Sequence, residues 1–204
     1  MSTRIAAAGL FVLLVVSVVA GAYIAFVSGG DEGIPRPTDG RYTNNRMRYT
    51  FEYPSDWADV SDQIKLSLPA GAKVKILDHV VVGSVEPEIG LLNGVQISVV
   101  QMSQTVDAGQ LEAELQALDA IFQQQATTVK GTLSTPEWVE LGGLKARQYV
   151  FDFTFGFGDR AASAQVVTFF GDRQYTVNCQ GRFSSFDEKV LPGCEQVLQS
   201  FRFR

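Results

Sequence analysis

The sequence has few of the side chains from which metal centres and nucleophilic active sites are built. Its 204 residues include one histidine, His79, and two cysteines. The H-E-x-x-H zinc motif, the EF-hand loop and the P-loop are absent, and no G-x-S-x-G turn presents a nucleophilic serine. We therefore predict no catalytic residue, no cofactor and no metal. We expect His79 to face solvent or to bond locally.

Basic residues are also in short supply. The chain has 17 Lys and Arg against 22 Asp and Glu, a formal net charge of −5, and no basic stretch stands out. Proteins that bind nucleic acids need clustered positive charge to contact phosphates. Nucleic acid is therefore not an expected partner.

The two cysteines, Cys179 and Cys194, are too far apart in the sequence for the C-x-x-C motif of redox-active sites. Too few other ligands are present for a structural zinc site. In an oxidising compartment an isolated pair of this kind is most simply a structural disulfide, worth about 3 kcal/mol in the chain-entropy model.

One segment is rich in what the rest lacks: Ile5 to Val27 is an apolar run without a charged residue. As a helix it is about 34 Å long, which is enough to cross a hydrocarbon core of about 30 Å. Arg4 precedes the run, and Asp31 and Glu32 follow it. The positive-inside rule then predicts cytoplasmic residues 1–4, a single-pass signal-anchor at 5–27 and an extracytoplasmic remainder in the cell membrane.

A secretory signal is the alternative reading of the same segment. Ala20-Gly21-Ala22 fits an A-x-A cleavage site, and cleavage after Ala22 would release a secreted protein. The apolar run continues to Val27, which favours a retained anchor. No cysteine follows the run, so a lipid-modified N-terminus is not expected. Both alternatives export the rest of the chain.

Residues 28–40 (SGGDEGIPRPTDG) are rich in glycine and proline and predict a flexible linker. Residues 41–204 then form one extracytoplasmic domain, long enough to bury roughly 70% of the surface of its unfolded chain.

Alternating apolar and polar residues predict several strands in this domain. Met47, Tyr49, Phe51 and Tyr53 alternate with polar residues, and a turn at Asn44-Asn45 gives this strand a partner at 41–43. We expect Trp57 to pack beneath the loop that follows Pro54. Further strands are expected within 73–85 and 94–102.

The second half predicts an aromatic meander. A hairpin turns at Gly142-Gly143 and enters a strand with an aromatic residue at every odd position, at Tyr149, Phe151, Phe153, Phe155 and Phe157. These side chains must form a slab on one face of the sheet, and their burial stabilises the fold. Turns at 156–159 and at Gly171-Asp172 complete three antiparallel strands.

Two helices are expected. Asp107 to Gln110 resembles a capping box before an amphipathic helix at 108–125. Ser185 to Glu188 is a second match, opening a C-terminal helix that Pro192-Gly193 breaks or kinks, so that its regular part begins with Pro192 in the first turn. Antiparallel hairpins interrupted by helices predict an α+β domain, with helices packed on a mostly antiparallel sheet. A disulfide between the cysteines would then join the last helix to the sheet.

Three segments together resemble the PsbP-like family, and within it the membrane-attached or exported bacterial members. They are Phe51-Glu52-Tyr53-Pro54 with Trp57, the aromatic meander, and the ending from Tyr175 to Arg202 that contains both cysteines. The resemblance covers roughly residues 42–203. It implies a central antiparallel sheet flanked by helices and a non-catalytic accessory or binding role.

Two other patterns favour structural readings. Gly156 to Ala161 matches G-x-G-x-x-A, but a strand is expected after it where a dinucleotide site requires a helix, so it predicts a glycine turn. Asp56, Asp59 and Asp62 form an acidic group, and Glu86 and Glu88 flank Pro87. Neither spacing supplies the ligands of a calcium site.

The sequence therefore predicts a membrane-anchored, extracytoplasmic, non-catalytic domain that presents a PsbP-like module to an unknown protein partner or apolar ligand. Two alternatives remain open. The first is an exported hydrolase with a dispersed site, for which His79, Asp56, Asp59 and Asp62 are the available candidates. The second is a lipid or small-molecule carrier with a cleft between the aromatic sheet and the helix at 108–125.

Overall fold

The computed structural model describes residues 36–64, 75–86, 91–155 and 158–204. The predicted anchor at 5–27 and the first part of the predicted linker lie outside these ranges. No helix within the described ranges is long and apolar enough to cross a membrane. At the start of the described chain Pro37 is buried, and Thr38 exchanges two backbone hydrogen bonds with Arg41. The end of the predicted linker is thus packed against the domain.

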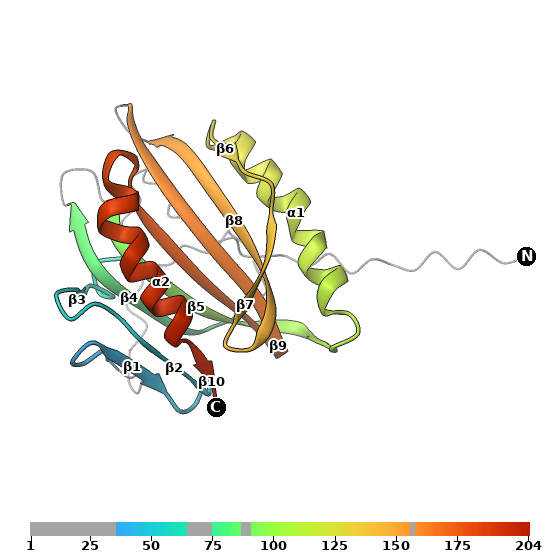
Figure 1. The fold of residues 1–204 in the computed structure, drawn as a ribbon. Helices are drawn as coiled ribbons and strands as arrows, with labels where there is room; N and C mark the ends of the chain where they lie inside the picture. Colours follow the sequence, from blue (N-terminus) through green and yellow to red (C-terminus); the bar gives the residue numbers. More distant parts are fainter. Residues whose placement is uncertain (1–35, 65–74, 87–90, 156–157) are drawn as a thin grey trace, which may run out of the picture.

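The described residues form two antiparallel sheets and two α-helices (Figure 1). The small sheet has the order β1-β2-β10, and the large sheet has the order β3-β4-β5-β9-β8-β6 with β7 paired to β8. The strands are β1 (Arg41–Asn44), β2 (Tyr49–Glu52), β3 (Ala58–Asp59), β4 (Lys75–Glu86), β5 (Leu91–Val106), β6 (Thr132–Leu133), β7 (Glu137–Leu141), β8 (Leu144–Phe155), β9 (Asp159–Arg182) and β10 (Arg202–Phe203). The helices are α1 (Leu111–Thr128) and α2 (Leu191–Ser200). This confirms the predicted α+β class.

The long strand β9 consists of two antiparallel halves joined at Gly171. Its first half pairs with β8 and its second half pairs with β5. Gly171 has a φ of +64°, a backbone conformation that glycine adopts without the strain that a side chain would introduce. The predicted turn at Gly171-Asp172 and the three-stranded meander are confirmed.

Alternation along the strands gives the large sheet two different faces. On β5, Val95, Ile97 and Val99 point to the face that the small sheet and α2 cover. We call this the apolar face. On β8, Tyr149 and Phe151 point to the opposite face, which we call the second face, and there α1 packs against them. Figure 1 shows α2 in front of the sheet near β5 and β9, with α1 beside β8.

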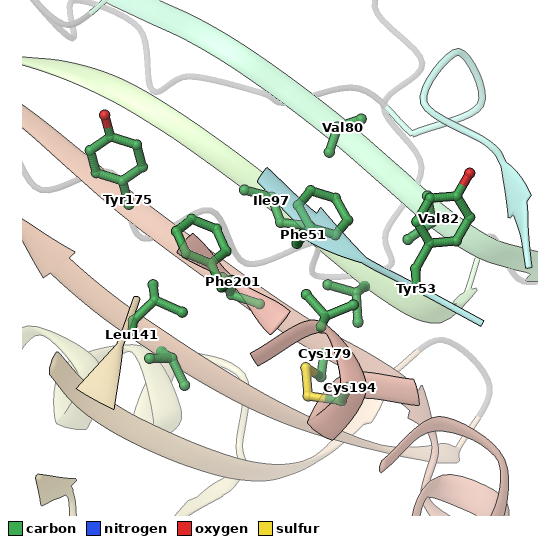
Figure 2. Packing of buried hydrophobic residues seen from close by; sticks show 14 of the residues in the cluster. Phe51, Tyr53, Val80, Val82, Ile97, Leu141, Tyr175, Cys179, Cys194 and Phe201 are labelled. Atoms are coloured by element: carbon green, nitrogen blue, oxygen red, sulfur yellow. A yellow bond between two sulfur atoms is a disulfide. The ribbon is translucent and has the colours of Figure 1, made fainter. Parts of the chain in front are cut away.

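Aromatic rings dominate the packing on the apolar face (Figure 2). Phe201, just after α2, stacks on Tyr49 with 5.2 Å between ring centroids and on Phe51 with 6.4 Å. The predicted alternation in the first hairpin is confirmed, because its four apolar positions, Met47, Tyr49, Phe51 and Tyr53, are all at most 4% exposed. Stacked pairs of this kind add about 0.5–1.5 kcal/mol each to the effect of area burial.

The expected disulfide joins Cys179 of β9 to Cys194 of α2, with 5.9 Å between the Cα atoms. Both cysteines are at most 1% exposed and lie within the apolar core shown in Figure 2. The bond fastens the last helix to the middle of the sheet, as the sequence predicts.

The aromatic slab is present, and α1 covers it. Tyr149, Phe151 and Phe153 are buried on the second face, and the ring of Phe122 from α1 stacks on Tyr149 at 3.7 Å. Side chains fill the space between this part of the sheet and the helix, so the cleft proposed for a carrier is not found among these residues. The side chain of Phe155 and all of Phe157 lie outside the described part.

Both helices begin later than the capping-box matches suggest. Helix α1 starts at Leu111, and no side chain caps its first turn. The side chain of Gln110, just before the helix, accepts a hydrogen bond from the Asp107 N–H at 3.4 Å. Ser185 makes no capping bond either. A 3-10 turn at Phe183–Ser185 and a π-helical turn at Phe186–Val190 precede α2. The prediction that the regular helix begins with Pro192 in its first turn is confirmed.

Trp57 packs against the start of α2 at Gly193. A Cβ atom at Gly193 would lie 2.4 Å from Cζ2 of Trp57 and 2.8 Å from Cγ of Pro54. The absence of a side chain therefore lets the Tyr53-Pro54 corner and the tryptophan approach the helix backbone closely.

We predict that Gly193→Ala lowers the free energy of unfolding by about 1–3 kcal/mol, because overpacking at Trp57 outweighs the better helix propensity of alanine. Denaturant titration of the purified chain measures this. Gly109→Ala is the matched control, since a Cβ atom at Gly109 would meet nothing within 4 Å. A Gly193→Ala variant as stable as the control would contradict close packing at this position.

Candidate functional site

The structure places His79 and the aspartate beside it on opposite faces of β4. His79 lies on β4 opposite Ser98 of β5, with its side chain partly buried on the second face. The neighbouring Asp78 points to the apolar face, where it contacts Tyr42 and Tyr49. A histidine and an aspartate on opposite faces of one strand cannot act on the same substrate atom.

The acidic residues around β3 are neutralised locally. Arg36 pairs with Asp62 at 2.8 Å and lies 3.6 Å from Asp59, whose carboxylate also accepts a hydrogen bond from the Ser61 hydroxyl. Asp56 instead lines an open surface cleft of about 500 Å³ between the first hairpin and α2. Within the described ranges, no group of three or more His, Cys, Asp or Glu side chains is arranged to hold a metal ion.

Two further sequence patterns have structural roles where they are described. Glu86 accepts hydrogen bonds from Asn93 and Arg182. The bonds from Arg182 are the largest influence on the Glu86 carboxyl group, and its pKa lies below the ordinary value. In the glycine-rich segment, Gly158 has a φ of +103° and strand β9 follows it. The described residues of this segment therefore show the predicted turn. A strand follows the turn, and not the helix that a dinucleotide site requires.

A buried carboxyl group joins the two sheets. Asp78 is completely buried at a bulge in β4, and three side chains of the first hairpin donate hydrogen bonds to it. The hydroxyls of Tyr42 and Tyr49 lie 2.8 and 2.7 Å from Oδ2, and Asn44 Nδ2 lies 2.6 Å from the same atom. The carboxyl group is the acceptor in each bond, as an ionised carboxylate is. Because the carboxyl group is closed off from solvent, this cluster is a structural joint.

The second face contains a set of buried polar side chains that the sequence pattern did not reveal. We call it the amide strip. It covers the two central strands β5 and β9, and each of its members is at most 4% exposed. The members are uncharged: Gln96, Ser98, Ser163, Gln165, Gln174, Thr176, Asn178 and Gln180.

Strand pairing makes the amide strip continuous. Gln96 lies opposite Asn178, and Ser98 lies opposite Thr176, so the side chains of β5 and the second half of β9 form adjacent rows. The Ser163 hydroxyl donates to Asn178 Oδ1 at 2.6 Å and links the first half of β9 to the same rows. From Gln174 to Gln180 the strip extends roughly 20 Å. Its three rows of side chains, one from β5 and one from each half of β9, span roughly 10 Å.

Several carboxamide atoms of the strip have no hydrogen-bond partner among the residues that the structure describes. They are Gln96 Oε1, Gln165 Oε1 and Gln180 Nε2. An unpaired buried polar atom costs about 1–3 kcal/mol, and native proteins contain few of them. Three such atoms lie on one face of the central strands.

Helix α1 borders the strip. On its outer flank Asp119 accepts two hydrogen bonds from Arg147 and one from Tyr149. Burial raises the pKa of Asp119, but these bonds outweigh it and leave the pKa below its ordinary value. An α-helix turns by about 100° per residue, which places Ile121 and Gln125 on the flank of α1 opposite Asp119. Gln125 Oε1 is also buried, and it has no hydrogen-bond partner in the described part of the chain.

The sequence contains one signal for the strip that periodicity does not use. Other polar strand positions carry charges, as at Glu52, Glu140 and Lys145, and these side chains are exposed or partly exposed. The polar positions of β5 and β9 that form the strip carry amides and hydroxyls only. A polar strand face without charge is the feature that could have indicated burial.

Comparison with known proteins supports the fold class. No protein-family model matches the chain, and no curated protein matches it. Among solved structures, the solution structure of the cyanobacterial PsbP protein (CyanoP) of Synechocystis shares 18% identity at a TM-score of 0.50, covering 87% of this chain and 98% of that one. The domain therefore has a PsbP-like fold, as the sequence resemblance implies.

Two other solved structures are similar over large parts of this chain. One is a Bacteroides thetaiotaomicron crystal structure with 14% identity and a TM-score of 0.49. The match covers 82% of this chain, which spans about half (49%) of that one. The other is LpqN, described as involved in cell envelope biogenesis of Mycobacterium tuberculosis, with 13% identity, a TM-score of 0.44 and coverage of 76% and 82%.

We predict that Tyr49→Phe destabilises the domain by about 1–3 kcal/mol, because it removes a donor from the buried Asp78 carboxyl group. Tyr175→Phe is the matched control. Tyr175 is equally buried, but its hydroxyl donates to the Met47 backbone carbonyl at 2.9 Å. Bonds to charged acceptors are about twice as strong as neutral ones, so the control should lose less. Equal losses in denaturant titrations would contradict the carboxylate assignment.

Alkaline pH should also destabilise the domain. Burial raises the pKa of Tyr42 and Tyr49, and the nearby Asp78 raises both further. Burial likewise raises the pKa of Tyr149. The folded state therefore keeps protons that the unfolded chain loses above about pH 10. This stabilisation is complete below that pH and is lost as the pH rises toward the folded-state pKa values.

Denaturant titrations between about pH 8 and pH 11 should show stability falling above about pH 10, approaching 1.4 kcal/mol per pH unit for each such tyrosine. Tyr42→Phe should flatten the dependence. Phenolate absorbance showing that these tyrosines ionise at about pH 10 in the folded protein would contradict the prediction.

Proposed function

We propose that this chain is a membrane-tethered, extracytoplasmic accessory or binding protein without catalytic activity. The observation that carries the proposal is the PsbP-like fold of the domain, together with the apolar run that precedes it in the sequence. Catalytic sites place acids, bases and nucleophiles within hydrogen-bond reach of one another. His79 and Asp78 instead lie on opposite faces of β4, which supports a binding role.

The tether rests on the apolar run from Ile5 to Val27 and on the charge asymmetry around it. The disulfide between Cys179 and Cys194 supports an oxidising compartment, since such bonds are uncommon in the reducing cytosol. A domain held about a linker's length from the bilayer would meet its ligand at the membrane surface.

We expect the full chain, expressed in a bacterial host, to remain in the membrane pellet after alkaline carbonate extraction. When the outer layers of the cell are permeabilised, protease added from outside should digest the domain. A variant without residues 5–27 is the control and should leave the membrane fraction. An intact mass that lacks residues 1–22 would instead support the secreted form. A carbonate-soluble chain that external protease cannot reach would contradict the proposed location.

A further inference from the structure

Five arginines that lie far apart in the sequence gather at one end of the domain. They come from the turn between β1 and β2, from the second half of β9, and from β10 with the residue after it. We call them the arginine patch: Arg46, Arg48, Arg173, Arg202 and Arg204. Figure 1 shows β1, β2 and β10 together at the lower edge of the domain, with the end of the described chain beside them.

We infer that the arginine patch docks the domain onto the anionic phospholipid headgroups of a membrane. The inference deepens the proposed function and rests on it, because it gives the tethered domain a second contact with the bilayer. The phosphate of a headgroup complements the charge of the patch, and arginine binds phosphate through paired N–H donors.

Backbone pairing sets four of these arginines side by side. Arg48 Nε donates to the main-chain oxygen of Arg204 at 2.7 Å, and the Arg204 N–H donates to the Arg48 carbonyl at 2.8 Å. The Arg204 guanidinium group reaches Asn45 Oδ1 at 3.3 Å, next to Arg46 in the turn. Strand alternation places Arg202, two residues before Arg204, on the same side of the sheet.

The turn within β9 brings Arg173 to the same place. Burial raises the pKa of Tyr175, and the positive charges of Arg173 and Arg48 lower it in part. The Tyr175 hydroxyl donates to the Met47 carbonyl at 2.9 Å, one residue from Arg46 and from Arg48. The turn of the first hairpin and the turn of β9 therefore meet at this end of the molecule.

The patch keeps most of its charge. Asp172 Oδ1 lies 3.8 Å from Arg173 Nε, and among the described residues no other acidic side chain lies within 4.0 Å of the five guanidinium groups. Within the described part of the chain, the side-chain bonds of Arg202 and Arg204 are made by Nη1. A guanidinium group has five N–H donors, so the others can bind phosphate oxygens.

An exposed aromatic ring borders the patch. Phe170 precedes the turn at Gly171, its side chain is 39% exposed, and its ring centroid lies 5.3 Å from that of Phe203. Basic side chains beside an exposed aromatic ring are typical of protein surfaces that lie at the boundary between headgroups and acyl chains. An acidic polypeptide would complement the arginines but would give the ring no apolar surroundings.

The position of the tether also favours the bilayer. The described chain begins at Arg36 and enters the small sheet at once, since Thr38 exchanges hydrogen bonds with Arg41. Residues 28–35, between the predicted anchor and Arg36, can span at most about 28 Å. So short a connection holds the small sheet near the headgroups at a high effective concentration, which a soluble partner does not have.

The distribution of charge sets the orientation. The chain has a formal net charge of −5, although five of its arginines lie at one end of the domain. An anionic surface attracts this end and repels the remainder. The domain should therefore meet such a membrane with β1, β2 and β10.

The test uses the full chain in lipid nanodiscs made of dioleoylphosphatidylcholine, with or without about 30 mol% dioleoylphosphatidylglycerol. Traces of a lipid with a nitroxide on its headgroup broaden the NMR signals of amides close to the bilayer. In the anionic discs we expect strong broadening at Arg46 and Arg204, and little at Lys130 and Lys189, which lie beyond the far ends of α1 and α2. About 0.5 M salt should remove the effect, because it screens the charges.

The variant Arg46→Gln/Arg204→Gln removes two charges from the patch. It should lower the docking constant derived from the broadening by about 25-fold, since each arginine near an anionic surface contributes about fivefold. Lys130→Gln/Lys189→Gln is the matched control, because it removes the same charge at two exposed positions away from the patch. The control should dock as the unmodified chain does.

Two results would overturn the inference. The first is that the signals of Arg46 and Arg204 broaden equally in the neutral and the anionic discs. The second is that they shift when poly-L-glutamate is added to neutral discs but do not broaden further in anionic discs, which would assign the patch to an acidic polypeptide. A chain that stays in the discs without docking overturns this inference alone, whereas a chain that the discs do not retain contradicts the tether as well.

Discussion

The buried carboxyl group of Asp78 is the contact on which the arrangement of the two sheets depends. The small sheet has three short strands and could not remain folded alone, since isolated hairpins are marginal in water. Its hairpin is fixed because Tyr42, Asn44 and Tyr49 donate to one group on β4. With the hairpin in place, its rings meet Phe201, and the strand β10 that follows α2 pairs with β2. The apolar face is then covered by the first hairpin together with α2 and β10.

The disulfide acts at the other end of the same core. It holds α2 against the second half of β9, while Gly193 lets Trp57 and Pro54 approach the helix backbone. Because the apolar face is covered in this way, the stability of the domain does not depend on the centre of the second face. That centre can carry polar groups whose burial costs free energy, as binding sites commonly do.

Much of this fold could be predicted from the sequence because its strands alternate strictly. The first hairpin, the turns at Gly142-Gly143 and Gly171, the amphipathic helix and the cysteine pair all follow from local patterns. Asp78 could not be assigned in this way, since its partners are more than 28 residues away and nothing local distinguishes a buried aspartate from an exposed one. The short strand β10 was missed because two residues carry no periodicity.

The amide strip was missed for a related reason. Period-two alternation separates the two faces of a strand but does not say whether the polar face meets solvent. Gln174, Thr176 and Asn178 alternate with Tyr175, Val177 and Cys179 just as exposed residues would. Only the position of these strands at the centre of the sheet, next to α1, makes the polar face a buried one. The anchor at 5–27 remains a prediction from the sequence.

If the Asp78 carboxyl group fixes the small sheet on the large one, removing one of its donors must loosen the small sheet first. Backbone hydrogen exchange measured by NMR can detect this in the Tyr49→Phe variant of the full chain. We expect faster exchange in β1, β2 and β10 and little change in β5 and β9. An equal increase in both sheets, or no increase at all, would contradict the central role of Asp78.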